Sequence, residues 1–314
     1  MSTSSSSAAT SGLARYQLDI PTSALASSST RTRTSSTSDR SASSQSQHGF
    51  FYIPDFITAE EERYLMGKIN SAPQPKWKVL QARRLQHWGG QIAQKSGTLI
   101  PEPLPDWLVR FPNIVQRVRE TKAFVESKHE GPNHCLVNEY EAGQGIMPHE
   151  DGGAYFAAVA TLSLGSHTLL DIYRWAPEEP TATGSTDHDE ADARAREQHP
   201  VFSILQERRS LLITRGDAYK DYLHGIADRS SDTTQHFARV INGSSIKAPH
   251  LQQALISAGV AVQSDPAQAF EVLPAGAGTK QLPRVGVERQ TRVSITMRDV
   301  ERVSKGLGGV LGRR

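Results

Sequence analysis

The stretch Asn138-Glu-Tyr-Glu-Ala-Gly-Gln-Gly-Ile-Met-Pro-His-Glu-Asp151 places an imidazole and a carboxylate two residues apart, directly after a glycine-rich turn. In a β-strand, the side chains of residues i and i+2 project from the same face. His149 and Asp151 can therefore face one ion while Glu150 points away. The stretch predicts part of a metal site on a sheet, and a third ligand must come from elsewhere in the chain.

Two helices are predicted before this stretch. Residues 50–53 form a short apolar strand, and the capping-box pattern Thr58-Ala-Glu-Glu61 starts a helix that runs to about Asn70. A second helical stripe of apolar residues begins at Ile114 and extends to about Ser127.

Beyond Gly131-Pro132, the apolar period changes from that of a helix to that of a strand. Short strands are predicted at 136–140, 149–151, 157–164, 167–173, 202–206, 210–214 and 292–298. Two helices followed by many short strands indicate an α+β fold, in which helices support a β-sandwich or a jelly-roll barrel.

The ends of the chain and two internal segments differ in composition from this core. Residues 1–46 are mostly Ser, Thr and Ala, which cannot bury enough apolar area to fold, so a disordered tail is predicted there. The domain then covers 47–303, with insertions at 177–199 and 229–290, and a flexible tail follows at 304–314. The second insertion contains a predicted short helix at Leu251–Ile256.

No run of 18 apolar residues and no apolar signal-peptide core is present. The Arg and Ser content of the first residues is compatible with a transit peptide, but Asp19 and Asp39 interrupt it and Pro21 breaks any long amphipathic helix. We expect a soluble intracellular monomer in the cytoplasm and nucleus, without a membrane partner.

The single cysteine, Cys135, excludes an internal disulfide and a zinc–cysteine cluster, and it is expected to be a small buried apolar residue. The net charge of +2 is too small to indicate nucleic-acid binding from bulk electrostatics.

The segment from Gln81 to Gly90 carries two arginines, a histidine and a tryptophan before a Gly-Gly pair. One interpretation is a solvated loop with Trp88 packed inward. The other is a lid that faces the substrate and stacks on a planar group.

Eleven histidines compete for the third ligand position. We favour His224, because Tyr222-Leu-His-Gly-Ile226 follows an apolar strand and a Gly-Asp turn, and the glycine after the imidazole allows a close approach. His134, His167 and His236 also flank predicted strands and remain alternatives. Two histidines and one carboxylate would form the triad typical of non-heme Fe(II) oxygenases.

The last predicted strand carries Arg292, Ser294, Thr296 and Arg298 on one face and apolar residues on the other. Two guanidinium groups that point into a barrel need an anion, and arginine pairs well with carboxylates. A dicarboxylate co-substrate would satisfy both. The alternative is a strand at the rim, with its arginines in water.

In their order along the chain, these residues resemble the AlkB family of Fe(II)/2-oxoglutarate dioxygenases, within it the AlkB homologue 6 subfamily. The resemblance rests on four segments and on the Arg292-x5-Arg298 pair, and it covers 47–303 apart from the insertions. The four segments are Leu136–Tyr140, Gly145–Gly152, Thr161–Thr168 and Tyr222–Ile226.

The resemblance implies a double-stranded β-helix, which is a jelly roll, with iron held by His149, Asp151 and His224. It further implies that Arg292 holds the distal carboxylate of 2-oxoglutarate. Residues that would accompany it around the co-substrate are Asn138, Tyr140, Ser294 and Arg298. The implied reaction consumes O2 and 2-oxoglutarate to hydroxylate a C–H bond, and an N-methyl group would leave as formaldehyde.

Two positions depart from the members of the family that repair nucleic acids. Gly153 replaces the second acid of an H-x-D-x-D/E pattern, and Ser294 replaces an asparagine. We predict oxidative demethylation of alkylated DNA or RNA; the alternatives are a protein hydroxylase or demethylase and a non-catalytic nucleic-acid-binding module. Candidate substrate contacts are Arg83, Arg84, His87, Trp88, Tyr155 and Phe156.

Overall fold

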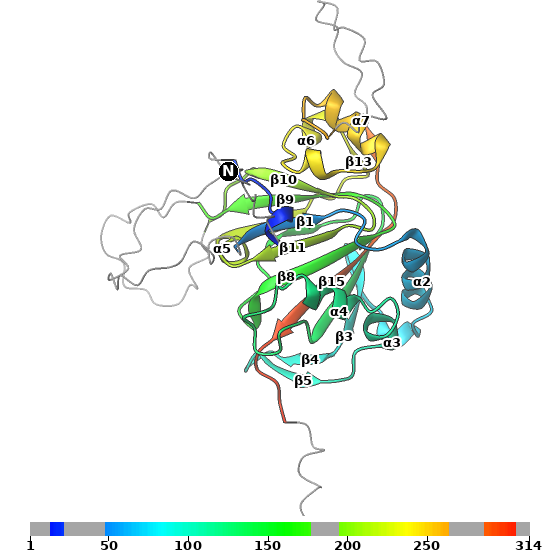
Figure 1. Ribbon diagram of the computed structural model, residues 1–314, viewed down its shortest axis with the longest axis vertical. Helices are drawn as coiled ribbons and strands as arrows, with labels where there is room; N and C mark the ends of the chain where they lie inside the picture. Colours follow the sequence, from blue (N-terminus) through cyan, green and yellow to red (C-terminus); the bar gives the residue numbers. More distant parts are fainter. Residues whose placement is uncertain (1–12, 22–47, 177–194, 264–285, 306–314) are drawn as a thin grey trace, which may run out of the picture.

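The computed structural model describes residues 13–21, 48–176, 195–263 and 286–305. Two antiparallel sheets face each other (Figure 1). The large sheet has seven strands in the order β1-β11-β8-β15-β6-β3-β2, and the small sheet has four in the order β10-β9-β12-β7. This arrangement confirms the predicted α+β jelly-roll fold.

The large sheet contains β1 (Gly49–Ile53), β2 (Lys78–Leu80), β3 (Arg83–Trp88), β6 (His134–Tyr140), β8 (Tyr155–Leu164), β11 (Leu211–Arg215) and β15 (Arg292–Val300). The small sheet contains β7 (Ile146–His149), β9 (Thr168–Arg174), β10 (Phe202–Gln206) and β12 (Tyr222–Ile226). Two separate pairs are β4 (Gly90–Ala93) with β5 (Thr98–Pro101), and β13 (Ser231–Asp232) with β14 (Val287–Glu288).

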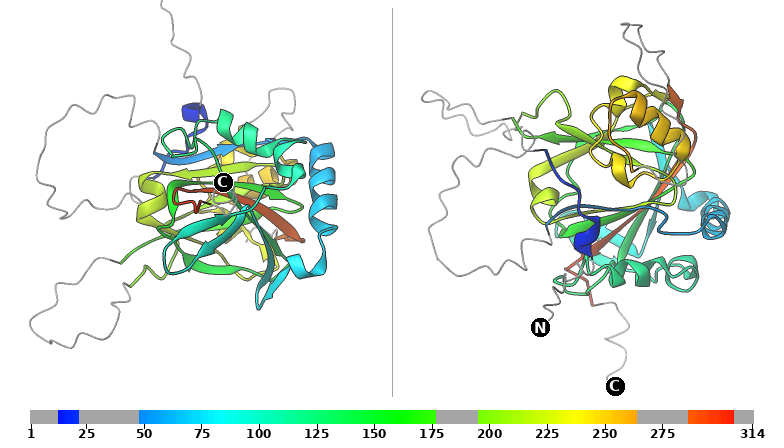
Figure 2. Two further views of the ribbon diagram at one scale, coloured as in Figure 1. Left: turned by 90° about the horizontal axis from the view of Figure 1, so that it is seen from below. Right: turned by 45° about the horizontal axis from the view of Figure 1, so that its top comes forward.

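Three helices cover the outer face of the large sheet: α2 (Ala59–Asn70), α3 (Asp106–Val109) and α4 (Ile114–Glu120) (Figure 2). The predicted capping box begins α2, since the Thr58 hydroxyl accepts from the Glu61 amide at 3.2 Å and the Glu61 carboxylate accepts from the Thr58 amide at 2.8 Å. The other helices are α5 (Asp217–Asp221), α6 (Thr234–Phe237) and α7 (Pro249–Ser257), with 3-10 turns η1 (Leu13–Tyr16), η3 (Gln74–Lys76) and η4 (Gly243–Ser245).

The alternation along β15 separates the core from the site. Val293, Ile295 and Met297 are fully buried beneath the helices. Arg292 and Arg298 belong to the opposite set, which lines the space between the sheets. The predicted polar face of this strand is confirmed.

The segment from Gln81 to Gly90 is neither a loop nor a lid. Most of it forms β3, which pairs with β2 on one side and β6 on the other. Polar side chains on both of its faces hid the period-two pattern. On the face away from the cavity, Arg84 donates to Glu139 and Trp88 donates to Gln86.

The second helix is shorter than predicted. It ends at Glu120, and Lys122 adopts a φ of +63°, which no helix accommodates. Apolar residues such as Phe124 still pack into the core from the turns that follow. The apolar residues of these turns are spaced in the sequence as they would be in a helix, which is why the longer helix was predicted. The predicted strand at 149–151 is also shifted, since β7 ends at His149.

The predicted N-terminal tail is wrong at residues 13–21. Leu18 is buried, its amide donates to the Phe50 carbonyl at 2.8 Å, and Gln17 bridges to Phe51 beside β1. Leu13 and Tyr16, two of the few apolar residues in this part of the tail, are partly buried against the core. The rest of the predicted tail, with the end of the chain from residue 306, lies outside the described residues.

The described parts of the second insertion pack on the small sheet. Asn242 exchanges two hydrogen bonds of 2.9 Å with the Leu205 backbone, and Val240 bridges Ser203 of β10, the edge strand of the small sheet. The predicted helix within this insertion is confirmed as α7. Residues 177–194 and 264–285 lie outside the described residues. In the described part of the chain, no helix is long and apolar enough to cross a membrane.

Candidate metal centre

Two histidines and one aspartate meet at one end of the small sheet. His149 on β7 and His224 on β12 are direct cross-strand partners, and their ring centroids lie 4.5 Å apart. Asp151 follows β7, and one ligand atom from each of the three side chains lies within 4.8 Å of the others. Across the described ranges, no other group of three His, Cys, Asp or Glu side chains meets this spacing.

Asp151 is positioned by a turn and by the opposite sheet. Gly152 has a φ of +90°, which favours glycine, and the Tyr219 hydroxyl donates to its carbonyl at 3.0 Å. The guanidinium of Arg298, on β15 of the large sheet, forms an ion pair with the Asp151 carboxylate. The acid therefore reaches the two histidines from beyond the end of its strand.

Both imidazoles are prepared to bind a metal. His149 Nδ1 lies 2.8 Å from the Met147 carbonyl and donates its proton there. This leaves the lone pair of Nε2 free to bind a metal. Burial lowers the pKa of His224 to about 4, although the Asp151 carboxylate opposes that change. His224 is consequently neutral at pH 7, as metal ligation requires. Two imidazoles and a carboxylate fit Fe(II).

A cavity of about 100 Å³ adjoins the triad between the two sheets. Among its lining residues the cations are Arg83, Arg292 and Arg298, and the only carboxylate is Asp151. Since Asp151 is paired with Arg298, two positive charges remain for an anionic ligand.

Arg292 is the most deeply buried of these cations. Burial lowers its pKa to about 10, so it stays charged at pH 7. It forms no ion pair with any described residue, and its Nε has no hydrogen-bond partner there. An unpaired buried cation is unfavourable by several kcal/mol, which indicates that a ligand supplies the missing anion.

Neutral donors surround the same cavity. Burial raises the pKa of Tyr140, which keeps its hydroxyl protonated and able to donate. Asn138 accepts a hydrogen bond of 3.1 Å from Arg83 Nε, and Ser294 also lines the cavity. The structure thus brings together the residues predicted for the metal and those predicted for the co-substrate.

Comparison with known proteins identifies the family. Residues 49–298 match the family model described as the 2OG-Fe(II) oxygenase superfamily. Over 253 residues, the chain is 37% identical to the Danio rerio protein named "Probable RNA/DNA demethylase ALKBH6", covering 81% of this chain and 86% of the relative. The chain belongs to the AlkB family of 2OG-Fe(II) oxygenases.

More distant similarities extend to other AlkB homologues. The chain is 29% identical over 193 residues to the Mus musculus protein "tRNA (carboxymethyluridine(34)-5-O)-methyltransferase ALKBH8", covering 60% of this chain and 25% of that one. The solved structure of OsALKBH1 is similar with a TM-score of 0.40 and 12% identity, covering 80% of this chain and 98% of the other. This AlkB-family member is a 2-oxoglutarate-dependent dioxygenase that uses Fe(II), as the sequence motifs predicted.

Three of the predicted substrate residues lie on the site side of the large sheet. Arg83 lines the cavity, and His87 lies opposite Leu136, another lining residue. The rings of His87, His134 and Tyr155 form a row with neighbouring centroids 6.0 Å apart, and the Arg298 guanidinium lies 4.9 Å from the centroid of Tyr155. This row runs from the exposed His87 towards the triad.

The other three predicted substrate residues are engaged elsewhere. Arg84 binds Glu139 through two hydrogen bonds of 2.7 and 2.9 Å and covers the Trp77 ring at 4.1 Å. Trp88 donates to Gln86 and packs edge-on against Trp107. Phe156 packs on the large core beside Phe124. The structure does not bring these side chains to the cavity.

Sequence reasoning missed two residues that contact Arg292. Ser163 on β8 and Gln206 at the end of β10 each accept a hydrogen bond from its guanidinium. Gln206 is a polar residue at the end of an apolar strand. Polar residues are common at strand ends, so its position in the sequence did not indicate a role in the site. Their hydrogen bonds to Arg292 depend on how the two sheets face each other.

Proposed function

We propose that this dioxygenase removes alkyl groups from nucleic acid by oxidative demethylation. The observation that carries the proposal is the 37% identity, over 81% of the chain, to a relative named as a probable RNA/DNA demethylase. The positive cavity lining supports it, because a phosphodiester substrate and a dicarboxylate co-substrate are both anions.

In this proposal, His149 Nε2, His224 and the Asp151 carboxylate hold the iron. Arg298 orients Asp151 through their ion pair. Arg292 binds the distal carboxylate of 2-oxoglutarate, and the Tyr140 hydroxyl donates to it. Asn138, Ser294 and Arg298 line the cavity around the rest of the co-substrate.

When bound, the metal supplies oxidative decarboxylation of 2-oxoglutarate by O2, in which one oxygen atom enters succinate and the other a substrate C–H bond. With an N-methyl group, the N–CH2OH product loses formaldehyde and restores N–H. The protein contributes orientation and charge, since the arginines that line the cavity neutralise the co-substrate's carboxylates.

On the substrate side, Arg83 lines the cavity, and the rings of His87 and Tyr155 lie in one row with His134 beside it. A guanidinium suits a backbone phosphate, and exposed rings can stack on a base. These three residues are the proposed contacts for the nucleotide that carries the alkyl group.

The test supplies Fe(II), 2-oxoglutarate and single-stranded DNA or RNA oligonucleotides with N-methylated bases, and measures formaldehyde and succinate. The wild type and the surface variant His250→Ala should release both, whereas His149→Ala should release neither above background. Equal release by the wild type and His149→Ala would overturn the proposal. Turnover of N-methylated peptides but of no oligonucleotide would also overturn it, and would make the enzyme a protein demethylase.

A further inference from the structure

The guanidinium of Arg292 is held by two buried neutral side chains, one from each sheet. Its Nη2 donates to Ser163 Oγ at 2.8 Å and to Gln206 Oε1 at 2.9 Å, and Ser163 Oγ itself donates to Gln206 Oε1 at 2.9 Å. Ser163 and Gln206 are no more than 1% exposed. We propose that Gln206 is a positioning and selectivity residue, which with Ser163 orients Arg292 and leaves its charge available to the distal carboxylate of 2-oxoglutarate.

The hydrogen-bond inventory of the guanidinium supports the orienting role. Arginine has five N–H donors, and the two on Nη2 match the two acceptors that the protein provides. The N–H groups of Nη1 and Nε have no such partner among the described residues, and Nε is buried. One side of the guanidinium is therefore fixed, and the remaining donors are left for a ligand.

The chemistry of Gln206 supports the selectivity role. An amide oxygen accepts the same hydrogen bond as a carboxylate without neutralising the cation. Glutamate at this position would form a buried ion pair with Arg292, and a ligand carboxylate would then have to compete with it. Because Gln206 is uncharged, Arg292 keeps its positive charge at the place where a dicarboxylate has its second anionic group. A monocarboxylate has no such group.

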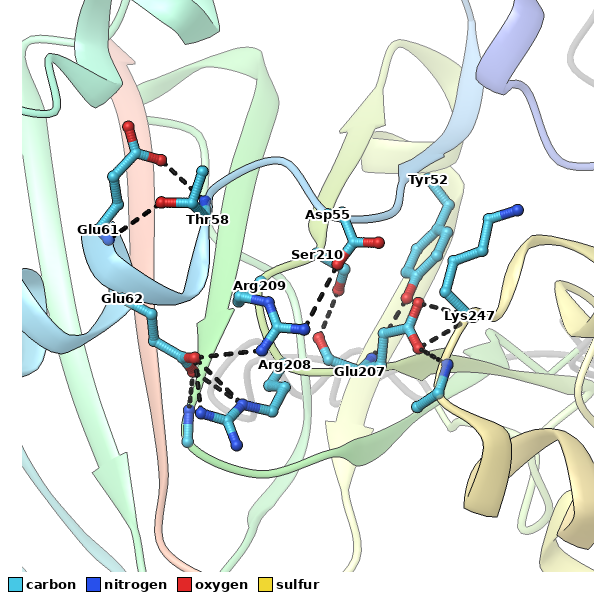
Figure 3. Close-up of polar contacts among 12 residues, drawn as sticks. Tyr52, Asp55, Thr58, Glu61, Glu62, Glu207, Arg208, Arg209, Ser210 and Lys247 are labelled. Atoms are coloured by element: carbon cyan, nitrogen blue, oxygen red, sulfur yellow. Dashed lines mark hydrogen bonds and ion pairs between the residues drawn. The ribbon is translucent and has the colours of Figure 1, made fainter.

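The segments beside both residues are firmly attached (Figure 3). Glu62 of α2 accepts from the Gly165 amide at 2.8 Å, two residues after Ser163, and from Arg208 Nη2 at 2.7 Å, two residues after Gln206. The Arg209 amide and the Ser163 carbonyl are 2.6 Å apart, which ties the two segments directly to each other.

A second anchor holds the turn that follows Gln206. The buried Glu207 carboxylate accepts from the backbone amides of Lys247 and Ala248 at 2.9–3.1 Å, just before α7, and the Glu207 amide donates to the Tyr52 hydroxyl at 3.3 Å (Figure 3). Gln206 therefore approaches Arg292 from a rigid base, as a residue that orients a binding group must.

The proposal rests on the co-substrate role assigned to Arg292, and its test needs no nucleic acid. Binding of 2-oxoglutarate to the Mn(II)-loaded full-length protein is measured by calorimetry without O2, beside binding of 2-oxobutyrate, which lacks the distal carboxylate. In Gln206→Glu, 2-oxoglutarate should bind at least ~10-fold more weakly, a change of about 1.4 kcal/mol, while the affinities for 2-oxobutyrate and Mn(II) stay within about twofold of the wild type. The preference for the dicarboxylate should fall accordingly.

Two further variants separate charge from structural damage. Gln206→Met removes the acceptor without adding charge and should weaken 2-oxoglutarate binding less than Gln206→Glu does. Gln86→Glu places the same change at another fully buried glutamine, which bonds to the Ile69 carbonyl and to Trp88 rather than to the site. It should leave the dicarboxylate preference unchanged.

The proposal is overturned if Gln206→Glu keeps the wild-type preference, if both 2-oxo acids weaken equally in it, or if the wild type does not bind 2-oxoglutarate. Absence of demethylation alongside normal 2-oxoglutarate binding would count against the proposed function alone.

Discussion

At the scale of single residues, burial sets the protonation states that the chemistry needs. It lowers the pKa of His224 to about 4, which leaves a neutral imidazole for the metal, and it raises the pKa of Cys135 to about 12. The same desolvation acts in opposite directions because one group is charged when protonated and the other when deprotonated. A neutral metal ligand and an unreactive thiol follow from one cause.

The Cys135 thiol should therefore be inert in the folded protein. With a pKa of about 12, roughly one thiol in 10⁴ is ionised at pH 8, and the side chain is 1% exposed. An aromatic disulfide reagent should not react measurably in native buffer, but should label one thiol per chain in urea, since Cys135 is the only cysteine. Cys135→Ser should give no signal in either condition. Rapid labelling of the native protein would contradict the burial described here.

The sequence was informative about individual residues where a period or a motif marked them. Alternation on the last strand placed Arg292 and Arg298 on one face, and the H-x-D pattern paired His149 with Asp151. Gln206 could not be found in this way, because its partner Arg292 lies 86 residues away on the other sheet. Contacts between sheets leave no local pattern.

At the scale of elements, one buried acid joins the two ends of the second insertion. Asp232 on β13 is fully buried and accepts from Arg289 at 2.7 and 2.8 Å and from Arg229 at 2.7 Å, while His167 lies 3.2 Å away. Burial alone would raise the pKa of Asp232, but the nearby His167 side chain and the hydrogen bonds and charge of Arg289 lower it well below its ordinary value. Arg229 and Arg289 lie near the two ends of the insertion, so this carboxylate joins them.

Asp232→Asn should lower the free energy of unfolding at pH 7 by about 3 kcal/mol, because it leaves buried arginines without their anion. Since the folded pKa lies below the unfolded value of about 3.9, the contribution is complete above that pH and is lost as the pH falls through the folded pKa. Urea unfolding should show the same difference between wild type and variant at pH 7 and pH 5, and a smaller difference at pH 3.5, where the loss begins. The exposed Asp106→Asn should change stability by less than about 0.5 kcal/mol throughout. A difference that persists undiminished in acid would contradict this account.

Element predictions succeeded where one face was uniformly apolar. The capping box and the stripe on α2, and the long buried strands, had this property. β3 was missed because Arg84 and Trp88 find ion-pair, hydrogen-bond and ring partners on the side away from the cavity, and the sequence does not show such partners. The end of α4 was missed because turns can also bury apolar residues spaced like a helix.

At the scale of the whole molecule, the site is divided between the two sheets. His149 and His224 belong to the small sheet, whereas Arg292, Asn138 and Tyr140 belong to the large one. The Asp151–Arg298 ion pair and the Gln206–Arg292 hydrogen bond cross between them. The α+β class could be predicted from strand count and order, and the jelly roll from the resemblance to the AlkB family. The cavity could not be predicted, since it exists only where these two surfaces meet.

Because the ligands connect both sheets, binding should stabilise the entire domain rather than one end of it. With Mn(II) and 2-oxoglutarate each at 100 times its dissociation constant, each ligand should add about 2.7 kcal/mol. For a domain of this size, each should raise the melting temperature by roughly 5–10 °C. Calorimetric melting of the wild type and of His250→Ala should show both increments.

His149→Ala should show neither increment, because 2-oxoglutarate binds beside the metal. Arg292→Met should keep the metal increment and lose most of the co-substrate increment, since the distal carboxylate then has no buried cation to meet. The division of the site would be contradicted if Arg292→Met kept the full increment from 2-oxoglutarate, or if His149→Ala were stabilised by Mn(II) as much as the wild type.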